Sequence, residues 1–248
     1  MGRIVAGGGH SSRKILRYVV EMSGKEKAHF LFIATPSSDK PEEYAKASMR
    51  ASDLGCETRP LYLCKRKYTD EQLDELFSWA DIIYVCGGDT FRAVEIWKNT
   101  GIDRRLRDVF ERDSAILCGS SAGGICWFRR GFSDSSRTPE YGKHGWVDGI
   151  GIFPDRVFCP HFANRGDAFR QALRDSGEEG MALDNYTAYV YDNGRELFLR
   201  RHPEGNISVF TQTGDGLLET VPDSILLEEY YPDDEIPGTP GVREEAGS

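Results

Sequence analysis

One serine of this sequence lies where a serine can act as a nucleophile. Ser121 is the centre of a Gly-x-Ser-x-Gly pentapeptide that directly follows the apolar run 115–118. Such a run predicts a buried strand, and a strand that turns sharply into a helix at a serine is a nucleophile elbow. The pattern therefore favours acyl transfer on the Ser121 hydroxyl, with a helix over 122–128. A glycine-rich turn with an idle serine would show the same pentapeptide.

A serine nucleophile needs an imidazole base at the same edge of the sheet, which for parallel strands is the carboxyl edge. His161 alone among the five histidines directly follows a predicted strand, over 156–159. The other four are weaker candidates: His10, His29, His144 and His202. His10 follows a glycine-rich turn at the same edge and His144 lies in a loop-like segment, so both stay open.

Spacing does not select the acid that would orient this base. Asp134 lies just past the predicted helix that Ser121 begins, and Asp155 and Asp184 are the alternatives. The glycine turns at 7–9 and 87–88 each follow a predicted strand, so their N–H groups are candidates to stabilise an oxyanion. Neither turn matches a nucleotide-binding motif.

Predicted strands and helices alternate through the first half of the chain. The strands are 3–6, 29–34, 57–63, 82–86 and 115–118, and the helices are 12–22, 40–54, 69–79, 90–98 and 102–112. This βαβα order predicts an α/β fold with a single, mostly parallel twisted sheet and helices on both faces, the three layers of flavodoxin-like folds.

The second half is less regular. The segment 130–151 is rich in Gly, Ser and Asp, and its composition predicts a long loop near the site. A helix is predicted over 163–174, followed by short strands over 182–183, 187–191, 196–200 and 207–210 that complete the same sheet. We expect one domain over 1–231 and an acidic, Pro/Gly-rich segment over 232–248 that is loosely packed or disordered.

Composition excludes several classes of function. The net charge of −9 comes without a basic stripe, which argues against nucleic acid as a partner. No apolar run approaches the roughly 20 residues that cross a bilayer, and the N-terminus shows no signal peptide, so we expect no membrane partner and a cytoplasmic location. The six cysteines form no Cys-x-x-Cys pair, and we expect neither a metal nor a cofactor.

Three short blocks together resemble a known family. They are Gly-Gly-Asp-Thr-Phe at 87–91, Gly-Ser-Ser-Ala-Gly-Gly at 119–124 and Pro-His-Phe at 160–162. Their order and spacing over roughly 1–215 are similar to those of the dipeptidase E family, whose members are serine peptidases with a class I glutamine amidotransferase-like fold. Cyanophycinases are relatives of this family.

The resemblance implies a role for each matching position. Ser121 would be the nucleophile, His161 the base and Asp134 the third member of the triad. The backbone amides of Gly88 and Ala122 would be the oxyanion donors.

The resemblance also implies residues that contact the substrate. An arginine shortly after the histidine would bind an acidic side chain, with Arg165 as the best match and Arg170 next. We expect Asp89 and Thr90 at the substrate as well. Asp89 replaces the asparagine usual in the family, and its carboxylate would repel an acidic substrate.

These observations predict a serine peptidase that hydrolyses short peptides and forms a homodimer. A first alternative is an amidohydrolase or esterase for a non-peptide or branched substrate, because acyl transfer looks alike at the elbow for each. A second is a binding module of the same fold without turnover. The serine argues against glutaminase chemistry, which uses a cysteine at this position.

Overall fold

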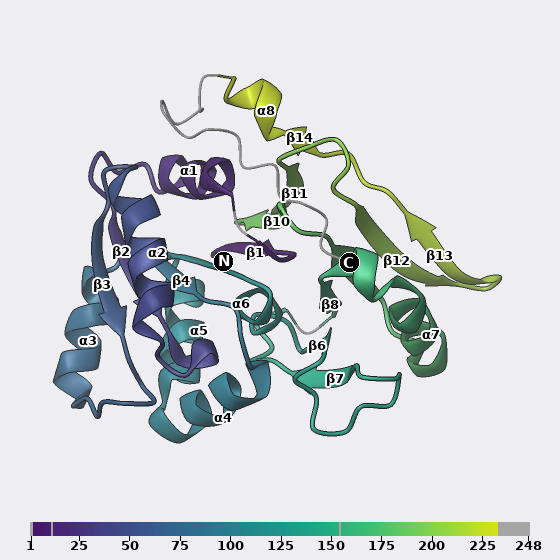
Figure 1. Ribbon diagram of the computed structural model, residues 1–248, viewed down its shortest axis with the longest axis horizontal. Coiled ribbons are helices and arrows are strands. Elements are labelled where there is room, and N and C mark those ends of the chain that lie inside the picture. The colour runs from purple at the N-terminus through teal and green to yellow at the C-terminus, as the bar shows by residue number, and fades with distance from the viewer. Residues whose placement is uncertain (1, 11, 154, 233–248) are drawn as a thin grey trace.

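The computed structural model describes residues 2–10, 12–153 and 155–232 and contains two β-sheets (Figure 1). The larger sheet has eight strands in the order β14-β11-β10-β1-β5-β4-β2-β3. Its parallel part comprises β1 (Arg3–Gly7), β2 (His29–Ile33), β3 (Glu57–Leu61), β4 (Ile82–Val85) and β5 (Ile116–Ser120). The antiparallel strand β10 (Thr187–Asp192) joins β1 to the outer strands β11 (Arg195–Arg200) and β14 (Ile225–Leu226).

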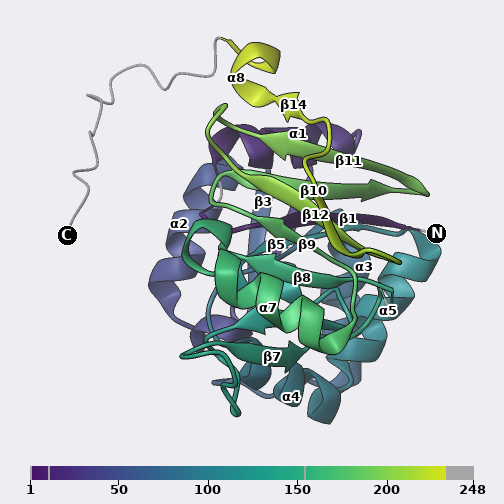
Figure 2. The ribbon, with the colours of Figure 1, turned by 90° about the vertical axis from the view of Figure 1, so that its right-hand side faces the viewer.

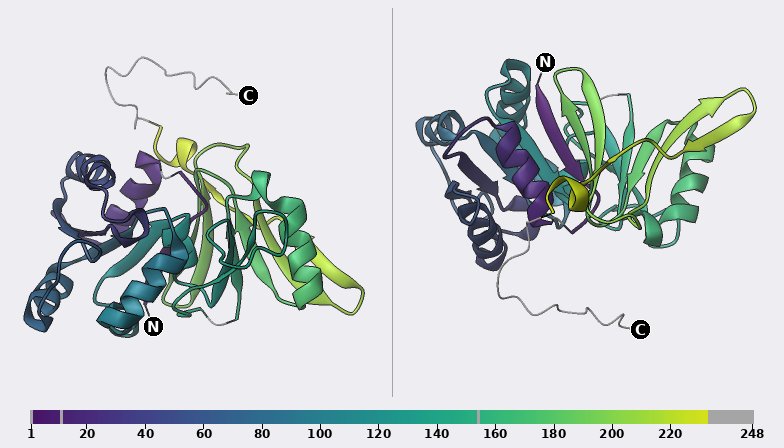
Figure 3. Two further views of the ribbon diagram at one scale, coloured as in Figure 1. Left: turned by 60° about the horizontal axis from the view of Figure 1, so that its bottom comes forward. Right: turned by 90° about the horizontal axis from the view of Figure 1, so that it is seen from above.

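Helices cover both faces of this sheet, as the right-hand view of Figure 3 shows. One face carries α1 (Arg13–Met22) and α2 (Pro41–Ser52), and the short α8 (Leu227–Tyr230) packs beside α1. The other face carries α3 (Asp70–Trp79), α4 (Thr90–Thr100) and α5 (Ile102–Arg112). The predicted α/β class with helices on both faces is confirmed.

Local signals explain where these helices begin and end. The Ser12 hydroxyl accepts the Ile15 N–H and caps α1, and Thr69 with Gln72 forms a complete capping box for α3. Gly101 adopts φ 73° between α4 and α5, a left-handed conformation that favours glycine. These positions fix the ends of the helices that flank the parallel strands.

The smaller sheet has six strands in the order β13-β12-β9-β8-β6-β7. They are β6 (Arg130–Ser133), β7 (Gly145–Asp148), β8 (Val157–Pro160), β9 (Gly180–Leu183), β12 (Ile207–Thr213) and β13 (Gly216–Thr220). Figure 2 shows α7 (Gly166–Ser176) crossing in front of this sheet, and its residue Phe169 is fully buried there.

The strands β10, β11 and β14 complete the large sheet, but the prediction of a single sheet is wrong for the other second-half strands. The central strands of that group, β8 and β9, are buried along their whole length and form the middle of a separate sheet. Along β8 the side chain of Phe158 packs into the core shared with the large sheet, whereas Val157 and Cys159 pack under α7. Side chains alternate between the faces of a strand, so this pattern makes β8 the middle of a second layer. The predicted loop 130–151 likewise contains β6 and β7, which pair as an antiparallel hairpin.

Two further predictions concern membrane-spanning segments and the acidic C-terminal segment. No helix in the described part of the chain combines the length and the apolar character that spanning a membrane requires. The acidic segment predicted over 232–248 lies outside the described residues apart from Pro232.

Candidate active site

Ser121 occupies a strained turn between β5 and the one-turn helix α6 (Ala122–Ile125). Its backbone has φ 57° and ψ −117°, a conformation that costs a non-glycine residue about 1–3 kcal/mol. Glycine is required on both sides: a Cβ at Gly119 would lie 2.6 Å from the Gly123 carbonyl oxygen. The predicted elbow is therefore present. Its helix ends at Ile125 rather than at 128, since Gly123 and Gly124 fill half of it and glycine is a poor helix former.

The structure brings Ser121 and His161 together. The serine Oγ lies 2.6 Å from Nε2 of the imidazole, which is hydrogen-bond distance. His161 directly follows β8, and β8 pairs in parallel with β9, so that Pro160 lies opposite Leu183. The residues that follow these two strands consequently meet at the same edge of the small sheet, beside the elbow.

The other ring nitrogen of His161 contacts Asn185. Its Nδ1 lies 3.2 Å from the Asn185 side-chain oxygen, and that oxygen also accepts the backbone N–H of His10 at 3.1 Å. Because a backbone N–H can only donate, the amide atom at this point is the oxygen. Nδ1 must then carry the ring proton, which leaves Nε2 free to accept the Ser121 hydroxyl proton.

None of the three predicted acids contacts the imidazole of His161 through its carboxylate. Asp134, the first choice, follows β6, and its carboxylate lies 3.5 Å from the Arg165 guanidinium. Its side chain is 60% exposed. Asp155 is exposed. Asp184 instead accepts the backbone N–H groups of Phe162 and Ala163, which follow the histidine.

The surroundings of His161 favour its neutral form. Burial lowers the pKa of the imidazole, and the nearby Arg165 guanidinium lowers it further. The hydrogen bond that Nδ1 donates to the Asn185 oxygen and the carboxylate of Asp134 act in the opposite direction and do not cancel these effects. A neutral imidazole at neutral pH is the form that accepts a proton from a serine hydroxyl.

The predicted oxyanion donors lie at the elbow. A Cβ at Gly87 would lie 3.5 Å from that of Ser121, so the 87–88 turn flanks the nucleophile. Gly88 has φ 140°, and a Cβ there would lie 2.2 Å from the Pro36 carbonyl oxygen. Within the described residues, no backbone hydrogen bond engages the N–H of Gly88 or of Ala122. Unpaired N–H groups at the start of a helix attract anions.

Three of the four predicted substrate-binding side chains have other polar contacts, and the fourth, Thr90, is buried. Arg165 is buried and donates to the Phe132 carbonyl oxygen at 2.8 Å, so it supports β6. Asp89 caps α4 by accepting the N–H of Arg92 at 3.0 Å and pairs with a guanidinium of the β6–β7 loop. Thr90 is fully buried in the first turn of α4.

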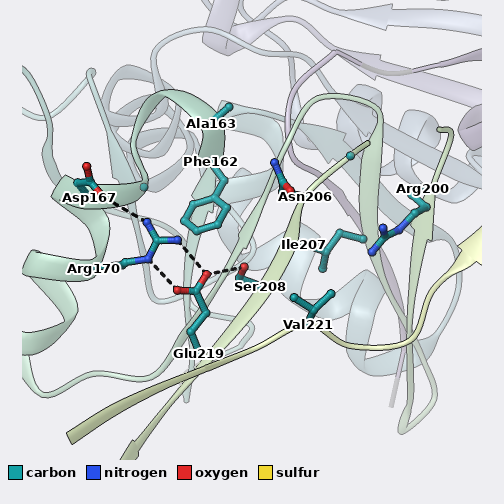
Figure 4. Close-up of a pocket in the computed structure, with 12 residues that line it drawn as sticks. Phe162, Ala163, Asp167, Arg170, Arg200, Asn206, Ile207, Ser208, Glu219 and Val221 are labelled. Carbon is teal, nitrogen blue, oxygen red and sulfur yellow. Dashed lines mark hydrogen bonds and ion pairs between the residues drawn. The ribbon is translucent and has the colours of Figure 1, made fainter. Parts of the chain in front are cut away.

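Arg170 belongs to a different cavity, of about 390 Å³ (Figure 4). Its guanidinium makes two hydrogen bonds to the Glu219 carboxylate, at 2.7 and 3.0 Å, and Glu219 also accepts the Ser208 hydroxyl. This bidentate pair closes the wall between α7 and the β12–β13 hairpin. Neither Arg165 nor Arg170 therefore reaches the serine in this structure.

A second cavity, of about 400 Å³, opens directly on Ser121 and His161. It is also lined by Phe32 and Tyr84 of the large sheet, by Gly9 and His10 after β1, and by residues of α2. The α2 side carries Glu43, Lys46 and Arg50. The volume is within the range of small-ligand sites.

Two features of this site were missed in the sequence. Asn185 was missed because an acid was expected beside the imidazole. Its position just after the short predicted strand over 182–183 could have indicated it. The charged residues of α2 escaped because only their 3.6-residue spacing, which gives them one helix face, could have indicated a shared surface.

Comparison with known proteins identifies the family. The family model described as peptidase family S51 matches residues 4–198. The uncharacterized peptidase YgaJ of Bacillus subtilis (strain 168) is 31% identical over 203 residues, which cover 78% of this chain and 84% of that protein. A cyanophycinase of Nostoc sp. is 21% identical over 208 residues, covering 81% and 69% of the two chains.

A solved structure shares the fold. The crystal structure of a peptidase from an acI-B1 Actinobacterium superposes with a TM-score of 0.65 at 21% identity, covering 91% of this chain and 97% of that one. The family match spans β1 to β11 and includes both Ser121 and His161. The chain therefore belongs to peptidase family S51 and is a serine peptidase.

Proposed function

We propose that this peptidase hydrolyses short peptides through an acyl-enzyme on Ser121, with His161 as the general base. The observation that carries the proposal is the 2.6 Å contact between the serine Oγ and Nε2 of a histidine whose tautomer is fixed. As the hydroxyl attacks the substrate carbonyl, Nε2 takes its proton. The N–H groups of Gly88 and Ala122 stabilise the oxyanion that forms.

The second half of the reaction reverses the proton transfer. The imidazolium gives its proton to the leaving amine, and water then attacks the acyl-enzyme with the same imidazole as base. Asn185 keeps Nδ1 protonated throughout, as an amide does in cysteine peptidases with a Cys-His-Asn arrangement. Unlike a carboxylate, the amide adds no negative charge, so the pKa of His161 stays low.

A neutral fluorophosphonate tests the proposal, because it reacts with activated serines only. We expect the native protein to be labelled and the Ser121→Ala variant to remain unlabelled. The matched control is Ser114→Ala, which removes an exposed hydroxyl just before β5, at the opposite end from the elbow. Equal labelling of the native protein and Ser121→Ala would remove Ser121 from the mechanism.

A branched peptide is the second candidate substrate. The 21% identity to the cyanophycinase supports it, and the Ser121–His161 pair would act on either amide in the same way. Rates on cyanophycin and on a panel of linear dipeptides distinguish the two, and we expect the faster turnover on the dipeptides. A cytoplasmic location and a homodimer stay predictions from the sequence.

A further inference from the structure

We propose that Arg50, assisted by Lys46, binds a carboxylate of the peptide substrate. The inference rests on the proposed function and adds a specificity determinant to it. Both side chains project from α2 into the 400 Å³ cavity that also holds Ser121 and His161. A peptide bound for attack by the serine therefore has a cationic wall within its binding site.

The charges of this wall do not cancel. Glu43 pairs with Lys46 at 3.3 Å, one turn apart on the same helix. Arg50 lies one turn further, and no ion pair of the described residues uses its guanidinium. The cavity thus carries a net positive wall in a chain whose overall charge is −9. His161 adds no positive charge there, since burial and Arg165 favour its neutral form.

The rest of the lining fits the uncharged part of a peptide. The half-buried ring of Tyr84 lines the cavity with the buried Phe32 stacked against it, and the 87–88 turn borders the nucleophile. Carboxylate recognition by an arginine uses two parallel N–H···O bonds, for which a guanidinium needs free donors. Arg50 meets this condition, whereas Arg165 and Arg170 are bound to the Phe132 carbonyl and the Glu219 carboxylate.

A peptide offers such a carboxylate from two sources: its C-terminus and an acidic side chain. Three substrates separate them. Ala-Ala has only the C-terminal carboxylate, Asp-Ala-amide has only the side-chain carboxylate, and Ala-Ala-amide has neither. The measurement is kcat/KM of the native protein, Arg50→Gln and Arg174→Gln. Arg174 is an exposed arginine of α7, beyond the small sheet, and controls for the loss of one charge.

We expect the native protein to prefer one of the carboxylate substrates to Ala-Ala-amide by about tenfold, the size of one charged hydrogen-bond interaction. Arg50→Gln should abolish this preference, while Arg174→Gln keeps both the preference and the native rate on Ala-Ala-amide. The substrate that loses rate identifies the source of the carboxylate.

Two results would overturn the inference: a native protein that cleaves all three substrates equally, or a preference that survives in Arg50→Gln. Fluorophosphonate labelling of Ser121 is measured in parallel, because it needs the serine and the imidazole but no carboxylate. Labelling without a carboxylate preference refutes the role of Arg50 alone. Absence of both labelling and turnover refutes the proposed function together with it.

Discussion

The carboxylate of Asp184 accepts the backbone N–H of Phe162 at 2.8 Å, and the same oxygen accepts the next N–H, of Ala163, at 2.6 Å. These two residues follow His161, whose own backbone has φ 134°, an unusual value for a side-chain-bearing residue. The next residue along the chain, Asn185, contacts the imidazole itself. The end of β9 thus holds both the backbone and the ring of the base.

Replacement of Asp184 by alanine should loosen the backbone that carries the base. Two N–H groups, one of them in a buried residue, would lose their acceptor, at a cost of about 3 kcal/mol in the free energy of unfolding. For a chain of this size the Tm should fall by roughly 6–12 °C. We also expect kcat to fall, because the imidazole is no longer held against Ser121.

Thermal unfolding and dipeptide hydrolysis measure both effects. The matched control is Asp155→Ala, which removes an exposed acid that the sequence also offered as a triad member. An Asp184→Ala protein with native Tm and native kcat would show that the backbone of the base is held by other contacts.

Asn185 allows a test by pH. The general base works in its neutral form, so kcat/KM rises as pH increases through the pKa of His161. Burial and Arg165 lower that pKa. The fall of kcat/KM on the acid side of the pH profile, its acid limb, therefore lies below the ordinary imidazole value of about 6.5. Asn185→Asp adds a carboxylate beside the ring and should move the limb to higher pH. Asn185→Ala should lower kcat on the order of 10²-fold.

The pH profiles of kcat/KM for the native protein and both variants provide the measurement. A purely structural asparagine would affect the Tm of both variants and leave the position of the acid limb unchanged. That result would remove Asn185 as the residue that orients the imidazole.

The sequence was sufficient for the parts of the site that depend on local pattern. The elbow follows from glycines around a serine after an apolar run, and His161 follows from its place directly after a strand. The helices over 12–22 and 69–79 were likewise predicted, and in the structure Ser12 and Thr69 cap them. In each of these cases, residues within five positions of one another determine the structure.

The parts that depend on pairing of distant segments could not be predicted in this way. Asn185 contacts His161 only because β8 and β9 pair in parallel in a second sheet. No local sequence pattern predicts that sheet. Arg165 has the spacing expected of a substrate ligand, but its burial against β6 depends on how α7 packs. Spacing along the chain therefore predicted proximity to the base but not the direction of the side chain.

At Gly9 the addition of a single methyl group should lower activity. A Cβ at this residue would lie 1.8 Å from the Asn185 side-chain oxygen and 2.7 Å from Nδ1 of His161. Gly9→Ala must therefore displace the amide or the ring, and we expect kcat to fall on the order of 10²-fold. Gly214→Ala is the matched control, since nothing lies within 4 Å of a Cβ there. Native kcat in Gly9→Ala would mean that this contact does not position the base.

Asp89 should respond as a helix cap rather than as a substrate ligand. Its side chain accepts the N–H of Arg92 at 3.0 Å, and asparagine caps helices as well as aspartate does. Asp89→Asn should therefore keep the native Tm, whereas Asp89→Ala should lower the free energy of unfolding by about 1 kcal/mol. KM for neutral peptides should not change in either variant. A KM that rises in Asp89→Asn with unchanged Tm would return this residue to the substrate site.

Arg165 and Asp134 provide a paired test, because their charges act on His161 in opposite directions. The guanidinium lowers the pKa of the imidazole and the carboxylate raises it. Arg165→Met should therefore move the acid limb of kcat/KM to higher pH, and Asp134→Asn should move it to lower pH. Neither change should discriminate between acidic and neutral peptides, since Arg165 is buried against the Phe132 carbonyl.

The competing hypothesis makes the opposite prediction for each residue. If Asp134 oriented the imidazole, Asp134→Asn would lower kcat about 10⁴-fold, as loss of the triad acid does elsewhere. If Arg165 held the substrate, Arg165→Met would raise KM for Asp-Xaa peptides only. Because the buried Arg165→Met variant also risks unfolding, Asp134→Asn carries the decision: its carboxylate is 60% exposed, so the variant should fold. A downward shift of the acid limb with nearly native kcat means that Asp134 acts on the base only through its charge.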